Sequence, residues 1–258
     1  MFNLFQKSPL LDESSIQWMF DCYAWALRHF DAKVFFNETI LVVPTNDCFP
    51  GEGNSPYAKA DLILQQVKHH AGMGNWPVQL VEEQDYVNAV PQLAFAGAVR
   101  GQHALAPESS DANSRLLATY QPELLRNPQA LIANYAQLLS HYLGGATRDL
   151  PPGGIENWPH VTELLGVFMG FGLMFANTAY QARVSSCGAC QGPIIQRTNY
   201  LSQFDITYAL AIFTVLKQIP NKDVTKYLKK TLHPFYKKAV KDIMGHEEEL
   251  QRLKEFQA

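Results

Sequence analysis

The sequence predicts an α+β protein, in which strands and helices are mixed in the N-terminal half and helices alone fill the C-terminal half. Two observations predict this class. Short β-branched or alternating runs, typical of strands, occur only before residue 127, and long apolar repeats at helical spacing follow it. No internal repeat, low-complexity tract or long linker divides the chain. A single domain over residues 1–258 is therefore expected, with a strand-containing half (1–126) and a helical half (127–258).

The N-terminal half alternates between the two patterns. Residues 14–30 and 57–70 carry apolar side chains at near-helical spacing, which predicts two helices. Between them, residues 44–55 hold two prolines, two glycines, two asparagines and an aspartate, which is the composition of a loop. Strands are predicted in four short segments rich in β-branched or apolar residues: 39–43, 78–82, 92–97 and 114–125.

The C-terminal half is predicted to be helical, with two loops rich in glycine, proline and polar residues at 144–157 and 185–198. Asn127 and Pro128 suit a helix start, because proline at the first helical position loses no hydrogen bond that the helix needs. Residues 164–176 are apolar throughout and fall short of the roughly 17 to 25 residues that cross a bilayer, so a buried helix and no membrane span are expected. The predicted helices are 128–143, 159–183, 202–218 and roughly 223–255.

Composition and charge exclude several classes of protein. The chain has 47% hydrophobic residues, 17% charged residues and a net charge of −3, whereas disordered and nucleic-acid-binding chains need a charge excess. No nucleic-acid partner is expected. Four cysteines in 258 residues do not make a secreted disulfide framework, and the N-terminus lacks the apolar core of a secretory signal. A cytoplasmic location is therefore expected.

Common catalytic templates are incomplete in this chain. There is no Gly-x-x-x-x-Gly-Lys-Ser/Thr loop, no dinucleotide turn with its third glycine, and no closing glycine that would make Ser55 a nucleophile elbow. His246 and Glu247 begin like a zinc-peptidase motif, but Leu250 stands where the second histidine is required. Phosphate-loop and serine-hydrolase functions are not indicated.

One predicted helix carries a polar stripe. At 100° per residue, Asn134, Gln137 and His141 fall within about 60° of one another on the helix 128–143, beside an apolar arc. A solvated or hydrogen-bonded face explains the stripe without any chemistry, and a ligand-binding face is the alternative.

The order of the predicted elements and the sequence of this helix resemble those of the zincin metallopeptidases, whose corresponding helix carries the motif His-Glu-x-x-His. The chain is most similar to a group of uncharacterised bacterial zincin-like proteins. Three later segments are also similar in sequence to that group. They are residues 162–172 of the next helix, the turn Cys187-Gly-Ala-Cys190, and Tyr200-Leu-Ser202 at a helix start. The resemblance covers about residues 129–243.

The departures from the zincin motif decide the function that the resemblance implies. Gln137 stands at the first histidine ligand and Leu138 at the glutamate that acts as general base, while His141 matches the second ligand. Loss of a general base typically costs a factor of about 10² to 10⁴ in rate. Glu163, in the region of the third ligand, leaves the metal with two protein ligands, so no cofactor is expected and zinc only at low occupancy. The resemblance therefore predicts a catalytically inactive homologue that binds an unknown protein or peptide partner.

Two other functions stay open. An active metal-dependent hydrolase could recruit His141, Glu163 and, as a reserve ligand, His160. A helical module could instead depend on Cys187 and Cys190, whose thiols are interpreted as a structural or incidental pair, half of a metal site, or a redox pair. Glu163 also has a structural interpretation, in which it is hydrogen-bonded to a closely packed neighbouring element.

Seven lysines lie between Lys222 and Lys241, interleaved with aromatic residues. Acidic residues follow at once and the whole chain is acidic, so a solvated amphipathic face is the favoured interpretation. An anionic partner is the alternative.

Overall fold

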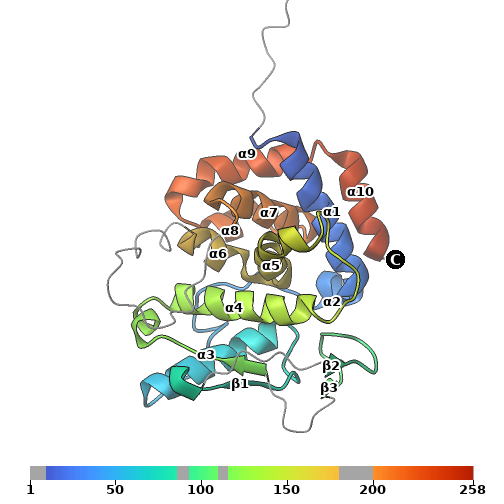
Figure 1. The fold of residues 1–258 in the computed structure, drawn as a ribbon. Helices are drawn as coiled ribbons and strands as arrows, with labels where there is room; N and C mark the ends of the chain where they lie inside the picture. Colours follow the sequence, from blue (N-terminus) through green and yellow to red (C-terminus); the bar gives the residue numbers. More distant parts are fainter. Residues whose placement is uncertain (1–9, 86–92, 110–115, 180–199, 258) are drawn as a thin grey trace, which may run out of the picture.

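The computed structural model describes residues 10–85, 93–109, 116–179 and 200–257, and this part of the chain is mostly helical (Figure 1). The α+β class is confirmed at this coarse level, with helices dominating and only short strands. The helices are α1 (Glu13–His29), α2 (Ala32–Asn37), α3 (Pro56–His70), α4 (Pro128–Gly144), α5 (Trp158–Gly166), α6 (Gly172–Thr178), α7 (Gln203–Leu216), α8 (Asn221–Thr225), α9 (His233–Ile243) and α10 (Glu247–Lys254).

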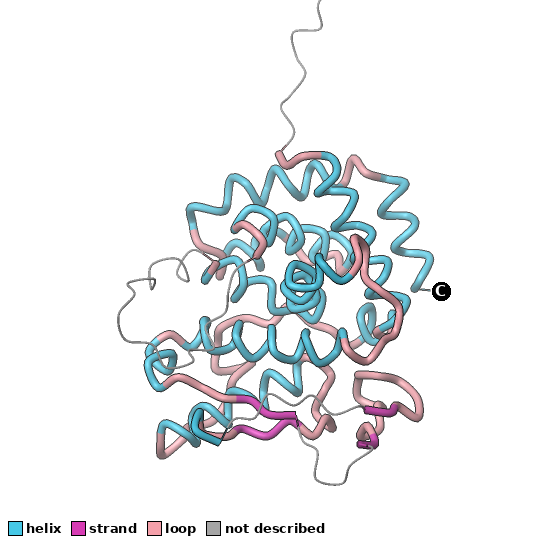
Figure 2. The backbone as a smooth tube through the Cα atoms, in the orientation of Figure 1, coloured by secondary structure: helices cyan, strands magenta, loops and turns pink. Residues whose placement is uncertain are grey.

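The strands form two small pairs (Figure 2). β1 (Val78–Leu80) runs parallel to β4 (Leu116–Ala118), with Val78 opposite Leu116, and β2 (Leu93–Ala94) runs antiparallel to β3 (Glu108–Ser109). Three predicted strand segments thus contain strands of two or three residues. The strand predicted at 39–43 is wrong, because this extended segment lies against a helical turn, where the N–H of Val42 donates to the carbonyl of Gly170 at 3.0 Å.

α4 occupies a central layer of the fold (Figure 1). It packs against α3 on one side and against α5 and α6 on the other. Asn127 begins the helix by accepting a hydrogen bond from the N–H of Ala130 at 3.4 Å, and Pro128 occupies its first turn. The helix start predicted at Asn-Pro is therefore confirmed, and α4 ends at Gly144 as expected within one residue.

The helix predicted at 159–183 is interrupted within the described part of the chain. α5 is followed by a π-helical turn (Val167–Phe171) and then by α6. Gly170 causes the break, because its φ of 99° lies in the left-handed region, and a Cβ atom there would overlap the carbonyl oxygen of Ile40. By length and composition the stretch Ile155–Thr178 could cross a bilayer, and its most apolar window is fully buried inside the protein. The prediction that 164–176 is buried is confirmed.

The helix predicted at 223–255 is also wrong as a single element. It is divided into α8, a 3₁₀ turn (Lys230–Leu232), α9 and α10, with Pro234 in the first turn of α9 and Gly245 before α10. These breaks let α9 pack on α7 and α10 turn back onto α1.

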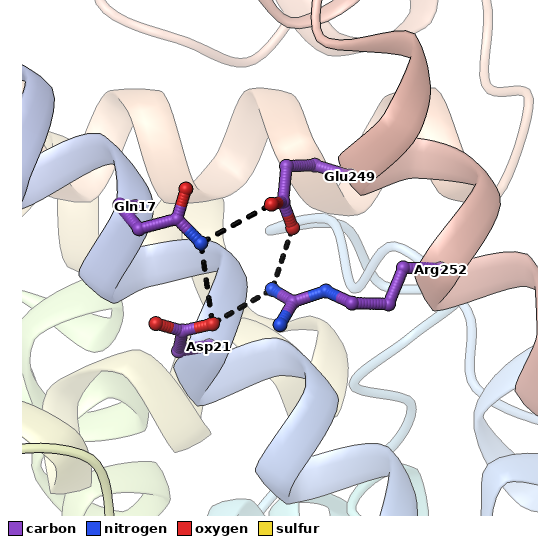
Figure 3. A network of polar contacts seen from close by, with 4 residues as sticks. All are labelled: Gln17, Asp21, Glu249 and Arg252. Carbon is purple, nitrogen blue, oxygen red and sulfur yellow. Dashed lines mark hydrogen bonds and ion pairs between the residues drawn. The ribbon is translucent and has the colours of Figure 1, made fainter.

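The contact between α1 and α10 carries a polar network at its edge (Figure 3). The Nη2 of Arg252 lies 2.8 Å from Asp21 and 2.6 Å from Glu249, and the amide of Gln17 donates to both carboxylates at 3.3 and 3.2 Å. All four side chains are partly exposed, so such pairs stabilise by at most about 1 kcal/mol each. The burial of Leu250 and Leu253 on α10 is the larger contribution.

A buried arginine joins the ends of two helices. Arg100 is fully buried, and its Nε donates to the carbonyl of Phe30 at 3.0 Å while its Nη1 donates to Thr39 Oγ1 at 3.2 Å and to the carbonyl of Ala71 at 3.3 Å. Phe30 and Ala71 are the C-terminal caps of α1 and α3, where a cation is favoured by the helix dipole. Burial lowers the pKa of Arg100 to about 10, so the guanidinium stays charged at neutral pH.

A second, half-buried cation lies at the end of α2. The Nζ of Lys217 donates to the carbonyls of Phe35 and Phe36 at 2.7 and 2.6 Å. The Phe35 ring stacks on Phe168 at 4.6 Å between centroids, and Phe168 also lies 5.0 Å from the guanidinium carbon of Arg100. The C-terminal ends of α1, α2 and α3 therefore meet at two cations and an aromatic stack, which fixes the segment leading from α2 into the following loop.

Candidate functional site

The predicted motif lies on two packed helices. Gln137, Leu138 and His141 are on α4, and His160 and Glu163 are on α5. The remaining predicted pair, Cys187 and Cys190, lies outside the described residues.

His141 is exposed in the last turn of α4. Its Nδ1 accepts a hydrogen bond from the indole Nε1 of Trp158 at 3.3 Å. Partial shielding of the imidazole from water lowers the pKa of His141 below its ordinary value, which favours the neutral ring. One ring nitrogen is thus already engaged by α5.

The two replaced motif positions are half-buried. Leu138 packs against the hydrophobic core, and the Oε1 of Gln137 is buried with no hydrogen-bond partner in the described part of the chain. A leucine side chain has no atom that can accept a proton. A neutral amide is a poor zinc ligand compared with imidazole.

Glu163 is fully buried, and its carboxylate holds the chain before α7. Its Oε2 accepts from the backbone N–H of Leu201 at 2.7 Å and from that of Tyr200 at 3.2 Å. The structural role that the sequence left open for Glu163 is therefore present in the structure. Gly166, on the same helix, faces the ring of Phe175 so closely that a Cβ would need Phe175 to move.

His160 lies between aromatic rings. Its ring is edge-on to Trp18 at 6.5 Å and to Tyr200 at 5.7 Å between centroids. Over residues 10–85, 93–109, 116–179 and 200–257, no group of three or more His, Cys, Asp or Glu side chains is arranged to hold a metal ion. In the described part of the chain, His141, Glu163 and His160 therefore do not make a three-ligand centre of the zincin kind.

A cleft of about 600 Å³ opens at the other end of α4. The loop 44–53 forms one wall, α3 forms the floor, and the start of α4 closes the far side. Its lining residues are Pro44, Thr45, Asn46, Phe49, Gly51, Glu52, Gly53, Lys59, Leu62, Ile63, Gln66, Leu125, Pro128 and Ile132.

The chemistry of this cleft is mixed. Phe49, Leu62, Ile63 and Ile132 supply apolar surface, and carboxamides from the loop and from α3 stand beside them. Glu52 and Lys59 add one charge of each sign at the rim, so the cleft has no net charge. Such a site suits a ligand with an apolar group next to hydrogen-bonding groups.

Local sequence explains how the cleft is formed. Ser55 caps α3 by accepting from the N–H of Ala58 at 3.1 Å, and Pro56 occupies the first turn. Gly53 lies so close to the backbone of Ala58 and Lys59 that a Cβ there would collide with it. The loop can therefore pack against the start of α3, and this places residues 44–53 over the apolar face of α3.

Sequence reasoning predicted the loop but not the cleft. The composition of residues 44–55 indicated irregular structure, and the spacing of Leu62 and Ile63 indicated a helix. Gly51 and Gly53 were a usable signal, because paired glycines in a loop often mark a close approach of backbone to another element or to a ligand.

Comparison of the chain with protein-family models, with curated proteins and with solved structures gives no significant match.

Proposed function

We propose that this protein is a non-catalytic, zincin-like binding protein that holds a short peptide segment in the cleft between the loop 44–53, α3 and the start of α4. The observation that carries the proposal is the cleft itself, with an apolar floor and carboxamide groups in a volume of about 600 Å³. This volume falls within the roughly 300–1,000 Å³ of ordinary ligand sites.

The side chains that line the cleft match the chemical groups of a peptide. Leu62, Ile63 and Ile132 suit an apolar side chain. The carboxamides of Asn46 and Gln66 each offer a donor and an acceptor, which are the two groups that a peptide backbone requires. In the described segments, neither carboxamide forms a hydrogen bond with another residue.

The zincin-like part of the proposal is supported by element order. The strand β4 is followed by a helix entered through Asn127 and Pro128, and that helix carries Gln137 and His141. Ile132 in the cleft precedes His141 by nine residues, about 13 Å along the axis of α4, so peptide binding needs no metal at the degenerate motif.

Replacing Leu62 with arginine should weaken peptide binding at least about tenfold, which corresponds to about 1.4 kcal/mol. The new side chain removes apolar surface from the cleft and introduces a charge that an apolar peptide group cannot solvate. The measurement is fluorescence anisotropy with a peptide selected from a random library. Leu150→Arg is the matched control, because Leu150 is 65% exposed and does not line the cleft.

Two results would contradict the proposal. Equal binding by Leu62→Arg and Leu150→Arg would place the peptide elsewhere. Cleavage of library peptides that a chelator stops, and that His141→Ala abolishes, would show catalysis and overturn the non-catalytic part.

The double substitution Gln137→His and Leu138→Glu should tighten zinc binding at least about tenfold. The reason is geometric, because positions 137 and 141 are four residues apart on α4 and project from one side of it. Calorimetric titration with Zn²⁺ compares the double variant with the natural protein, and Leu138→Glu alone is the control because it adds no imidazole. Equal affinities in a folded double variant would mean that this face of α4 cannot hold a metal and that the zincin resemblance is misleading.

A further inference from the structure

A second pocket, of about 370 Å³, lies where the start of α4, the end of α6 and the segment from α8 to α9 meet. We define it as the basic pocket by its lining residues, which are Asn127, Gln129, Asn177, Thr178, Thr225, Lys226, Tyr227, Leu228, Lys229, Lys230 and His233. Three of these side chains are lysines and none is acidic. The whole chain has a net charge of −3, so this concentration of positive charge is local.

The wall of the basic pocket is held in place by a buried amide. Asn177 is 6% exposed, and its Nδ2 donates to Gln129 Oε1 and to the carbonyl of Tyr227, both at 2.9 Å. Its Oδ1 accepts from the N–H of Lys229 at 2.9 Å. His233 secures the same segment through a 2.9 Å hydrogen bond between its Nε2 and the carbonyl of Leu228. The turn that presents the lysines is therefore tied to α4, α6 and α9 rather than free in solution.

The charges of the basic pocket are only partly balanced by the protein. In the described segments, no carboxylate lies within 4 Å of the ammonium group of Lys226, Lys229 or Lys230. Lys226 contacts the ring of Tyr227, and Asp223 attracts its charge from a longer distance. Two helices longer than eight residues, α4 and α9, also begin at the pocket with Asn127 and His233. The partial positive charge of their first turns has the same sign as the ammonium groups.

We infer that the basic pocket binds a small phosphate-bearing ligand. Ammonium groups and exposed N–H groups are the usual partners of phosphate oxygens, and a multiply charged anion gains most where several such groups converge. The pocket has the volume of about a dozen water molecules, at about 30 Å³ each, which exceeds the size of one inorganic phosphate ion. Pyrophosphate or an organic phosphate ester therefore fits it better. This site is separate from the proposed peptide cleft and does not depend on it.

The test uses two double variants that lose the same charge. Lys226→Gln/Lys230→Gln removes two ammonium groups from the basic pocket, whereas Lys237→Gln/Lys241→Gln removes two exposed ones from α9 outside it. The full-length protein is titrated calorimetrically with inorganic phosphate, pyrophosphate and glycerol phosphate at about 0.15 M ionic strength, where exposed long-range charge is screened. The three probes separate an inorganic ligand from an organic ester.

We expect saturable binding of pyrophosphate or the ester by the natural protein and by the Lys237→Gln/Lys241→Gln control, and at least tenfold weaker binding by Lys226→Gln/Lys230→Gln. Equal weakening in both double variants would mean diffuse surface charge and would overturn the inference, as would the absence of saturable binding. If the pocket variant proves unstable, hydrogen exchange on the natural protein decides the question. Added ligand should protect the amides of 225–233 and leave those of 237–243 unchanged.

Discussion

Replacing Arg100 with methionine should lower the free energy of unfolding by about 3–5 kcal/mol, the range expected when a buried, hydrogen-bonded charge is removed from its partners. Methionine fills much of the space but leaves three acceptors without their donor, namely the carbonyls of Phe30 and Ala71 and the hydroxyl of Thr39. It also removes the cation from the C-terminal ends of α1 and α3. Chemical denaturation followed by circular dichroism measures the change.

Two further variants test whether the loss of stability is specific to Arg100 and to the hydrogen bonds of its guanidinium. Arg148 is exposed, so Arg148→Met should change stability by no more than about 0.5 kcal/mol. Arg100→Lys keeps the charge but has a single nitrogen that cannot reach acceptors on three sides, so it should lose an intermediate amount of stability. A loss below about 1 kcal/mol in Arg100→Met would contradict the view that this arginine joins the helix ends.

The fold was predictable where local pattern determines structure. α1, α3, α4 and α7 follow from the spacing of apolar residues and from caps such as Asn127 and Ser202, because these signals lie within one element. The breaks at Gly170 and before α9 were missed. The break at Gly170 depends on a partner distant in sequence, the carbonyl of Ile40, and the apolar run around Gly170 does not reveal it. The break before α9 coincides with Pro234 in the first turn of that helix, a local signal that the prediction of one helix over 223–255 did not use.

The contacts of Arg100 show that buried polar connections, too, cannot be predicted from local sequence. Nothing in the sequence around it distinguishes it from an exposed arginine, yet its three acceptors come from positions 29 to 70 residues away. Asp31, which accepts from the N–H groups of Val99 and Arg100 at 2.8 and 3.3 Å, adopts a left-handed φ of 59° that the sequence did not indicate. Buried polar connections depend on the finished fold, and for this reason they are its least predictable part.

The candidate sites also include positions that the sequence predicted and positions that it did not. The polar positions on α4 were located correctly, because helical periodicity alone places Gln137 and His141 on one side. The cleft was not anticipated, since the loop 44–53, α3 and the start of α4 supply its walls and only the tertiary structure brings them together. The lysines from 226 to 230 were interpreted as part of a solvated face, and the side chains of Lys226 and Lys230 are indeed exposed. The sequence did not indicate that the backbone of this segment is tied to Asn177 and forms one wall of a pocket.

Replacing Gly170 with alanine should lower the free energy of unfolding by about 3–5 kcal/mol, from about 1–3 kcal/mol of backbone strain together with steric overlap and a weakened hydrogen bond. A methyl group at a φ of 99° overlaps the carbonyl oxygen of Ile40 and pushes away the segment that donates from Val42 to the carbonyl of Gly170. Gly154→Ala separates the two causes. Gly154 has a φ of 75°, but no atom lies within 4 Å of the position that its methyl group would take, so this variant should lose only the strain, about 1–3 kcal/mol.

The same change should also affect ligand binding, because the displaced segment leads directly into the loop 44–53 that forms one wall of the cleft. Under conditions where both alanine variants are folded, Gly170→Ala should bind the selected peptide several-fold more weakly than Gly154→Ala, whose loop does not line the cleft. Denaturant unfolding and peptide anisotropy on the two proteins measure both effects. Equal stability losses would show that the contact with Ile40 relaxes freely. Equal peptide affinities would show that the wall of the cleft does not depend on the packing of the π-helical turn.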